Sequence, residues 1–210
     1  MILNRYFAWF GLRGSLVLTI LLSLFALILA LIFPNKARWI CFVAMVLSSI
    51  GDVFLMHFTS IERLLPFPSF FAGAFAFMLS HIVYIIAFST EIRIGGYRFV
   101  NPGFYIGLGI VLATMVTVFT MALRQNYISP IMVSLCFVYA VIIGANCVTI
   151  FSYAWSVRSW RSIAALGALS FFISDLIIGL NKLLIPIPGS WRNAIWWFYP
   201  IGQILILLGG

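Results

Sequence analysis

Long apolar stretches, separated by short polar segments, run through the whole chain. Each stretch is close to the roughly 20 residues that a helix needs to cross the hydrocarbon core of a bilayer. The separators carry prolines, asparagines and charges, which are typical of chain reversals at a membrane surface. The pattern therefore predicts an all-α fold, a polytopic transmembrane helical bundle of about seven spans, in a single transmembrane domain over residues 1–210. The predicted spans are residues 15–33, 38–57, 67–88, 103–123, 128–151, 162–184 and 194–210.

The opening residues differ from this pattern. Residues 1–14 are too few to span a bilayer and include Trp9, so we expect them to lie along the membrane interface. The apolar run 15–33 is too long for the core of a signal peptide and lacks a small-residue cleavage site, which indicates a retained helix. Most of the tryptophans lie near predicted span boundaries, as expected of an interfacial aromatic belt.

Composition excludes a soluble domain and a nucleic-acid partner. The chain is 64% hydrophobic and 8% charged, and a soluble domain of this length could not bury so much apolar surface. The formal charge of +8 comes from basic residues scattered singly at helix ends, which favours anchoring to anionic head groups. The 12 basic residues divide equally between the two predicted faces, so the positive-inside rule assigns no orientation.

Metal and disulfide chemistry find little support in the sequence. The 3 cysteines, Cys41, Cys136 and Cys147, all fall within apolar stretches and without the spacing of a metal site or a disulfide framework. The 2 histidines add too few ligands for a zinc site. We therefore expect no metal and no cofactor.

The chain has only 4 acidic residues, and Asp52 and Asp175 lie inside predicted spans. A carboxylate at the centre of a bilayer costs at least about 2.5–3.5 kcal/mol, so it needs a partner, a water-filled cavity or a function. One interpretation is that each Asp is a structural group, hydrogen-bonded to a neighbouring helix. The other is that the two acids form a functional site.

Counting residues along the spans places several polar side chains at similar depth. Asp52 and Asp175 each lie about 20 Å from the start of a span that begins on the same membrane face. Gln203 lies about 14 Å and Tyr139 about 17 Å into spans that begin on the opposite face, so all four can share one layer. His81 lies about 10 Å deeper. It could relay protons or line a pocket, or it could be a structural hydrogen-bonding group between helices.

Two carboxyls in one layer suggest acid chemistry. Desolvation and mutual repulsion disfavour two charged forms, so such a pair holds one proton between its members at neutral pH. One acid and one carboxylate suit general acid catalysis with stabilisation of a developing cation, although the sequence does not say which Asp has which role. Lys182 follows Asp175 by about two turns on the same helix face, where it could contact a lipid phosphate or simply snorkel to the interface.

At these motifs the chain resembles the lysoplasmalogenase (YhhN-like) family of integral membrane proteins. The resemblance rests on the order and spacing of short motifs across nearly the whole chain. These are residues 48–56 (SSIGDVFLM), 73–77 (GAFAF), 81–84 (HIVY), Tyr139, 167–169 (GAL), 172–175 (FISD), 181–182 (NK), 199–200 (YP) and Gln203.

The resemblance implies a membrane-embedded hydrolase acting on ether bonds. Its expected substrate is a lysoplasmalogen, whose vinyl ether bond is cleaved to a fatty aldehyde and a glycerophospho-ethanolamine or -choline. It implies Asp52 and Asp175 as the catalytic acids, a lysophospholipid and membrane lipids as partners, and a multi-pass position in the inner membrane of a bacterial cell. The expected supporting or substrate-binding residues are His81, Tyr139, Asn181, Lys182, Tyr199 and Gln203.

One departure from the family concerns the start of the chain. The family usually has eight spans with a Lys-Pro pair opening the second, whereas this chain reads Arg13-Gly14-Ser15 at that position. We therefore expect the family's first helix to be missing here. The oligomeric state, the head group and the natural lipid stay open.

Two other functions use the same residues. A proton-coupled transporter of small molecules or lipids could carry protons on Asp52 and Asp175, but the similarity between the two Asp segments is too short to indicate the inverted repeats of that class. A non-catalytic lipid-binding or structural protein would tolerate Asn at either position, because burying an amide costs less than burying a charge.

Overall fold

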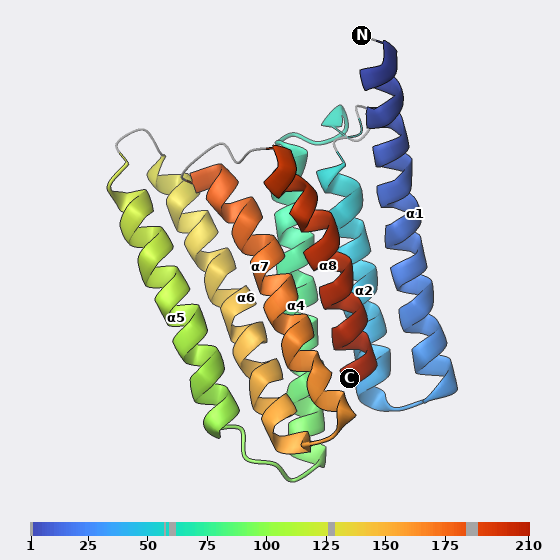
Figure 1. Cartoon of the computed structure of the whole chain (residues 1–210), viewed down its shortest axis with the longest axis vertical. Coiled ribbons are helices and arrows are strands. Elements are labelled where there is room, and N and C mark those ends of the chain that lie inside the picture. Colours follow the sequence, from blue (N-terminus) through green and yellow to red (C-terminus); the bar gives the residue numbers. More distant parts are fainter. Residues whose placement is uncertain (1, 57, 59–61, 126–128, 184–188) are drawn as a thin grey trace. The chain divides into compact units, whose positions relative to one another are not determined.

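The computed structural model of the chain describes residues 2–56, 58, 62–125, 129–183 and 189–210, without the side chains of 2–14, 182 and 189–193. Within these residues the secondary structure is helical and no strand occurs, so the predicted all-α class is confirmed. The elements are α1 (Ile2–Ile32), α2 (Lys36–Leu55), α4 (Ser69–Ile94), α5 (Pro102–Leu123), α6 (Pro130–Val157), the 3₁₀ turn η1 (Trp160–Ile163), α7 (Ala164–Leu183) and α8 (Gly189–Gly209) (Figure 1).

The helices match the predicted spans closely. In the described part of the chain, 6 helices are long and apolar enough to cross a membrane, and α8 adds a shorter apolar stretch over Ala194–Gly209. The chain is therefore a multi-pass membrane protein. The main difference lies in α1, which begins at Ile2, so the opening segment continues the first helix instead of forming a separate interfacial element.

Side-chain caps and prolines determine where several helices begin. The Asn35 side chain accepts a hydrogen bond from the backbone N–H of Arg38 at 2.7 Å, and the Asn101 side chain accepts one from Phe104 at 3.1 Å. Proline occupies the first turns of α5 and α6, where its missing N–H is not needed. At its other end α6 stops at Arg158, whose φ of 45° is left-handed.

The chain divides into two compact units, residues 1–83 and 84–210, with the division falling within α4. The prediction of a single domain over 1–210 stays a prediction. In the first unit, α1 packs on α2 through a stripe with helical spacing, namely Thr19, Leu22, Ala26 and Ala30, all buried. Between them, Ile20, Leu21, Leu24 and Ile28 are exposed and apolar, as expected of a helix that faces lipid, whereas half-buried Ser23 shares a hydrogen bond of 2.7 Å with Ser49 of α2.

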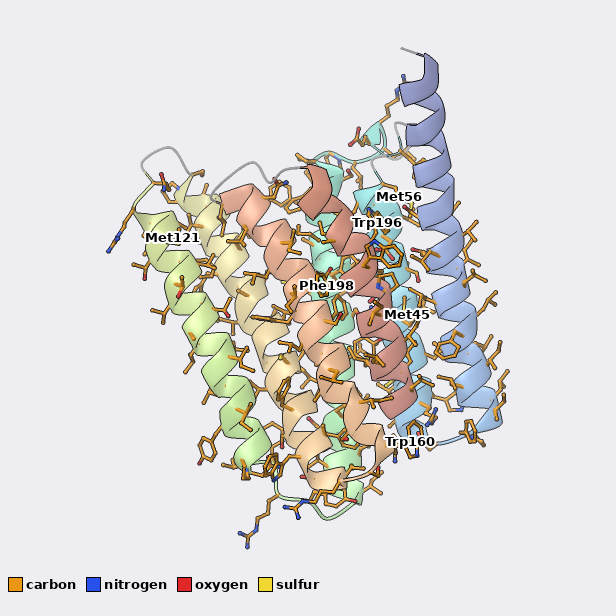
Figure 2. All side chains as sticks on the ribbon, in the orientation of Figure 1. Met45, Met56, Met121, Trp160, Trp196 and Phe198 are labelled. Carbon is orange, nitrogen blue, oxygen red and sulfur yellow. The ribbon has the colours of Figure 1, made fainter. Side chains whose placement is uncertain are left out.

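In the second unit, α5, α6, α7 and α8 lie side by side in chain order (Figure 1). Glycines allow the closest approach: a Cβ on Gly167 would lie 2.8 Å from the carbonyl oxygen of Gly202, so α7 and α8 pack backbone to backbone. In Figure 2, Trp160 lies near the C-terminal end of α8, and Trp196 lies nearer the N-terminal end of α8. Both tryptophans are exposed, as expected of aromatic belts at two interfaces.

One ion pair closes the unit near the end of α8. Arg161 Nη2 lies 3.1 Å from Glu91 Oε2, and Arg161 Nε donates a hydrogen bond to the carbonyl oxygen of Gly209 at 3.1 Å. The hydroxyl of Tyr153 donates to the same carbonyl at 2.9 Å. Glu91 thus forms an ion pair that links helix ends, and it is not available as a third intramembrane acid.

Candidate functional site

The acid of the first unit lies on α2 and is held by α1. Asp52 is 6% exposed, and Thr19 Oγ1 donates a hydrogen bond to its Oδ2 at 2.8 Å. The preceding residue is Gly51, where an added Cβ would lie 2.7 Å from the ring of Phe77 and 3.2 Å from the carbonyl oxygen of Gly73. This close contact with α4 confirms that a small residue beside Asp52 lets a partner helix approach.

Further polar groups lie near Asp52. One turn before it on α2, Ser48 shares a hydrogen bond of 2.7 Å with Ser80 of α4, and Ser80 donates to the carbonyl oxygen of Ala44 at 2.8 Å. His81 follows Ser80 and is fully buried. We call Thr19, Ser48, Asp52, Ser80 and His81 the Asp52 cluster.

The acid of the second unit lies on α7 and is held by α6. Asp175 is 8% exposed, and the hydroxyl of Tyr139 donates a hydrogen bond to its Oδ2 at 2.7 Å. The structure thus brings together two residues that depth counting placed in one layer. A phenol donating to a carboxylate is among the stronger hydrogen bonds between side chains, so it offsets part of the cost of burying the acid.

Two more predicted residues lie in the same unit. The hydroxyl of Tyr84 on α4 donates to Oε1 of Gln203 on α8 at 2.7 Å, and both side chains are fully buried. One turn before Gln203, buried Tyr199 stacks edge to face on Phe171, with ring centroids 5.4 Å apart. Phe171 itself lies one turn before Asp175. We call Tyr84, Tyr139, Asp175, Tyr199 and Gln203 the Asp175 cluster.

The last two predicted residues lie at the end of α7. Asn181 is exposed in its final turn. The backbone of Lys182 belongs to the same turn, but its side chain lies outside the described part of the structure, so its predicted phosphate contact stays a prediction. The common depth of Asp52 and Asp175 also stays a prediction, because the two acids belong to different units.

Sequence reasoning missed Thr19 and Tyr84. Tyr84 ends the HIVY motif and was a visible polar residue in an apolar helix, so its spacing from His81 was an available signal. Thr19 carried a weaker signal, its spacing of four residues from Ser15 and from Ser23 in an otherwise apolar stretch. In the part of the chain that the structure describes, no three His, Cys, Asp or Glu side chains lie close enough to hold a metal ion.

What both clusters offer chemically is a desolvated carboxyl group oriented by a neutral hydroxyl from the preceding transmembrane helix. A hydroxyl can donate to the carboxylate and, by rotation, also accept from a protonated acid. Such a partner fixes the direction of the carboxyl group. Both aspartates are thus held by a hydrogen bond from the helix that precedes their own in the chain.

Comparison with known proteins identifies relatives and a family for this chain. Human lysoplasmalogenase TMEM86A is 30% identical over an alignment of 179 residues that covers 83% of this chain and 65% of that protein. A lysoplasmalogenase homolog of Dictyostelium discoideum is 31% identical over an alignment of 180 residues that covers 73% of this chain and 54% of that protein. The chain thus spans less than two thirds of the length of either relative. No solved structure matches. The family model that matches covers residues 14–210, and the chain belongs to the YhhN family.

Proposed function

We propose that this protein is a membrane-embedded lipid hydrolase that cleaves the vinyl ether bond of lysoplasmalogens. The observation that carries the proposal is the pair of buried aspartates, each oriented by a hydroxyl group, in a chain whose relatives are named lysoplasmalogenase. The products are a fatty aldehyde and a glycerophospho-ethanolamine or -choline. The finer assignment to a bacterial inner membrane is part of the same proposal.

The reaction needs an acid more than a nucleophile. A carboxylic acid donates its proton to the alkene carbon remote from the ether oxygen, which leaves an oxocarbenium ion at the carbon bonded to oxygen. Water adds to that carbon and gives up a proton to a carboxylate, which forms a hemiacetal. The hemiacetal then breaks its carbon–oxygen bond to release the aldehyde and the glycerol hydroxyl. Acid donation and charge stabilisation are the roles that two carboxyls share in glycosidases.

Asp52 and Asp175 are the residues to which we assign these roles. Both lie well inside membrane-spanning helices, whereas Glu62 accepts from Ser69 at 3.2 Å, and Glu91, near the end of α4, pairs with Arg161. A protonated carboxyl can act as the general acid, and a carboxylate can stabilise the developing cation and accept the proton of the attacking water. Thr19 and Tyr139 hold the carboxyls in one orientation, which supports repeated proton transfer along the same path.

The remaining residues of the proposal would bind the rest of the lipid. Asn181 and Lys182 belong to the last turn of α7, two turns beyond Asp175. A lysophospholipid whose phosphate lies at the interface would place its vinyl ether below the phosphate, toward the depth of the acid. His81, Tyr199 and Gln203 are buried polar groups that support the two clusters.

The experiment is mass spectrometry of a lipid panel incubated with the purified protein. We expect wild-type protein to convert lysoplasmalogen to fatty aldehyde, and Asp52→Asn and Asp175→Asn each to lower the rate by at least about 100-fold, as loss of a general acid does. Glu62→Gln is the matched control, since it neutralises an acid outside both clusters and should keep the wild-type rate.

Two results would overturn this function. Wild-type rates in both Asp variants would remove the acids from the reaction. Uptake into proteoliposomes that follows a pH gradient, without any hydrolysis product, would instead establish the proton-coupled transporter.

A further inference from the structure

The buried hydroxyl of Ser174, next to Asp175, forms no hydrogen bond with the described residues that would stabilise the fold. Ser174 is 1% exposed, and among the described residues its Oγ has no hydrogen-bond partner. Buried polar groups are nearly always satisfied, so an isolated one calls for an explanation such as an absent ligand.

Several other hydroxyls within these helices bond to their own helix backbone, and others bond to a neighbouring helix, as Thr19, Ser80 and Ser170 do. A serine or threonine in a helix can donate to the carbonyl oxygen four residues earlier. The residues that do so here, at 2.7–3.0 Å, are Thr90, Thr114, Thr117, Thr149 and Ser156. Among the described residues, Ser174 forms no such bond to the corresponding carbonyl of Ser170.

The neighbours of Ser174 place that hydroxyl between α7 and α8. Ser170, one turn earlier on the same helix face, donates to the carbonyl oxygen of Phe198 on α8 at 2.8 Å. Phe171, three residues before Ser174, stacks on Tyr199 of α8. Ser174 therefore lies on the α8 side of α7, one turn beyond Ser170 toward the end that carries Asn181. It directly precedes Asp175 in the sequence.

We propose that the Ser174 hydroxyl binds the free glycerol hydroxyl of the lysolipid, an inference that rests on the proposed function. A hydroxyl both donates and accepts, so it matches another hydroxyl and fits neither a second acyl chain nor an alkane. A site that leaves a buried group unpaired when the substrate hydroxyl is missing discriminates against substrates without it. Ser174 is thus a specificity-determining residue for lysolipids over diacyl lipids.

The test compares two substrates in three proteins. The substrates are lysoplasmenylethanolamine and its analogue with hydrogen in place of the free glycerol hydroxyl. In wild-type protein we expect the analogue to lose about 3- to 10-fold in kcat/KM, the effect of one neutral hydrogen bond. Ser174→Ala should abolish this difference and raise KM for the natural substrate, with kcat little changed.

Ser170→Ala is the matched control. It removes a buried hydroxyl from the same helix face, but one that already bonds to Phe198. We expect it to lower the Tm and to keep the preference for the hydroxylated substrate. Ser174→Ala should instead keep or raise the Tm, because it removes an unsatisfied group. A preference that survives in Ser174→Ala, or an equal loss for both substrates, would overturn the proposal.

A binding measurement separates this proposal from the proposed function. The probe is a saturated alkyl-ether lysophosphoethanolamine, which has no vinyl group to protonate, with and without its free hydroxyl. If wild-type protein hydrolyses nothing, the proposed function fails. The role of Ser174 still stands if the hydroxylated probe raises the Tm of wild-type protein more than its deoxy form does, and if Ser174→Ala shows no such difference. Equal stabilisation by the two probes in wild-type protein would reject it.

Discussion

Replacing Tyr139 by phenylalanine removes one hydroxyl group and leaves the ring in place. In the structure that hydroxyl donates to Asp175 Oδ2 at 2.7 Å. A hydrogen bond to a charged group contributes about 1.5–3 kcal/mol. If the bond orients Asp175 in the transition state, its loss lowers kcat by about 10- to 150-fold, since about 1.4 kcal/mol corresponds to a factor of ten. We expect this fall in aldehyde production by mass spectrometry, together with a lower free energy of unfolding.

Tyr153 provides the control for this prediction. It lies on the same helix, is fully buried, and donates to the carbonyl oxygen of Gly209 at 2.9 Å. Tyr153→Phe should therefore lower stability by about 0.5–1.5 kcal/mol and leave kcat unchanged. In an Asp175→Asn background, Tyr139→Phe should have little further effect on turnover. The reasoning is refuted if Tyr139→Phe keeps full turnover, or if both Tyr variants lose turnover equally.

Two further predictions concern packing and buried polarity. Gly51→Ala places a Cβ 2.7 Å from the Phe77 ring and should lower the free energy of unfolding by about 1–3 kcal/mol. Gly109→Ala, with nothing within 4 Å, should be neutral or stabilising, and a similar Tm for the two variants would contradict the close packing. Tyr84→Phe removes the donor to the Gln203 amide and should cost about 1–3 kcal/mol. Thermal unfolding should show much of that loss recovered when Gln203 is also replaced by methionine, and no recovery would contradict the pairing.

The helical spans could be predicted because the bilayer imposes a length and polar separators mark the chain reversals. In the structure Asn35 and Asn101, which lie in two of these separators, cap α2 and α5. The predicted start of the first helix was wrong, because α1 continues back to Ile2. The thickness of the bilayer determines how many residues a span needs. It does not determine where a helix that extends beyond the membrane begins.

The acids could be recognised because a carboxyl group in an apolar helix is costly wherever it points. Their partners could be predicted only where a second polar residue had a visible position. Tyr139 is a polar residue well inside its span, and depth counting placed it at the level of Asp175, to which it is bonded. Depth follows from residue number along a helix, whereas contact also requires that two helix faces meet.

Thr19 shows why facing could not be predicted. In a soluble amphipathic helix the polar face reveals the buried one, but in α1 only a few small hydroxyl residues interrupt the apolar run 15–32, which gives little contrast. The stripe that packs α1 on α2 consists of Thr19, Leu22, Ala26 and Ala30, and the exposed positions of the helix are apolar as well. A threonine in such a helix can satisfy itself through its own backbone, so its presence alone indicates no partner. Only the packing of small residues turns Thr19 toward α2, where it meets Asp52.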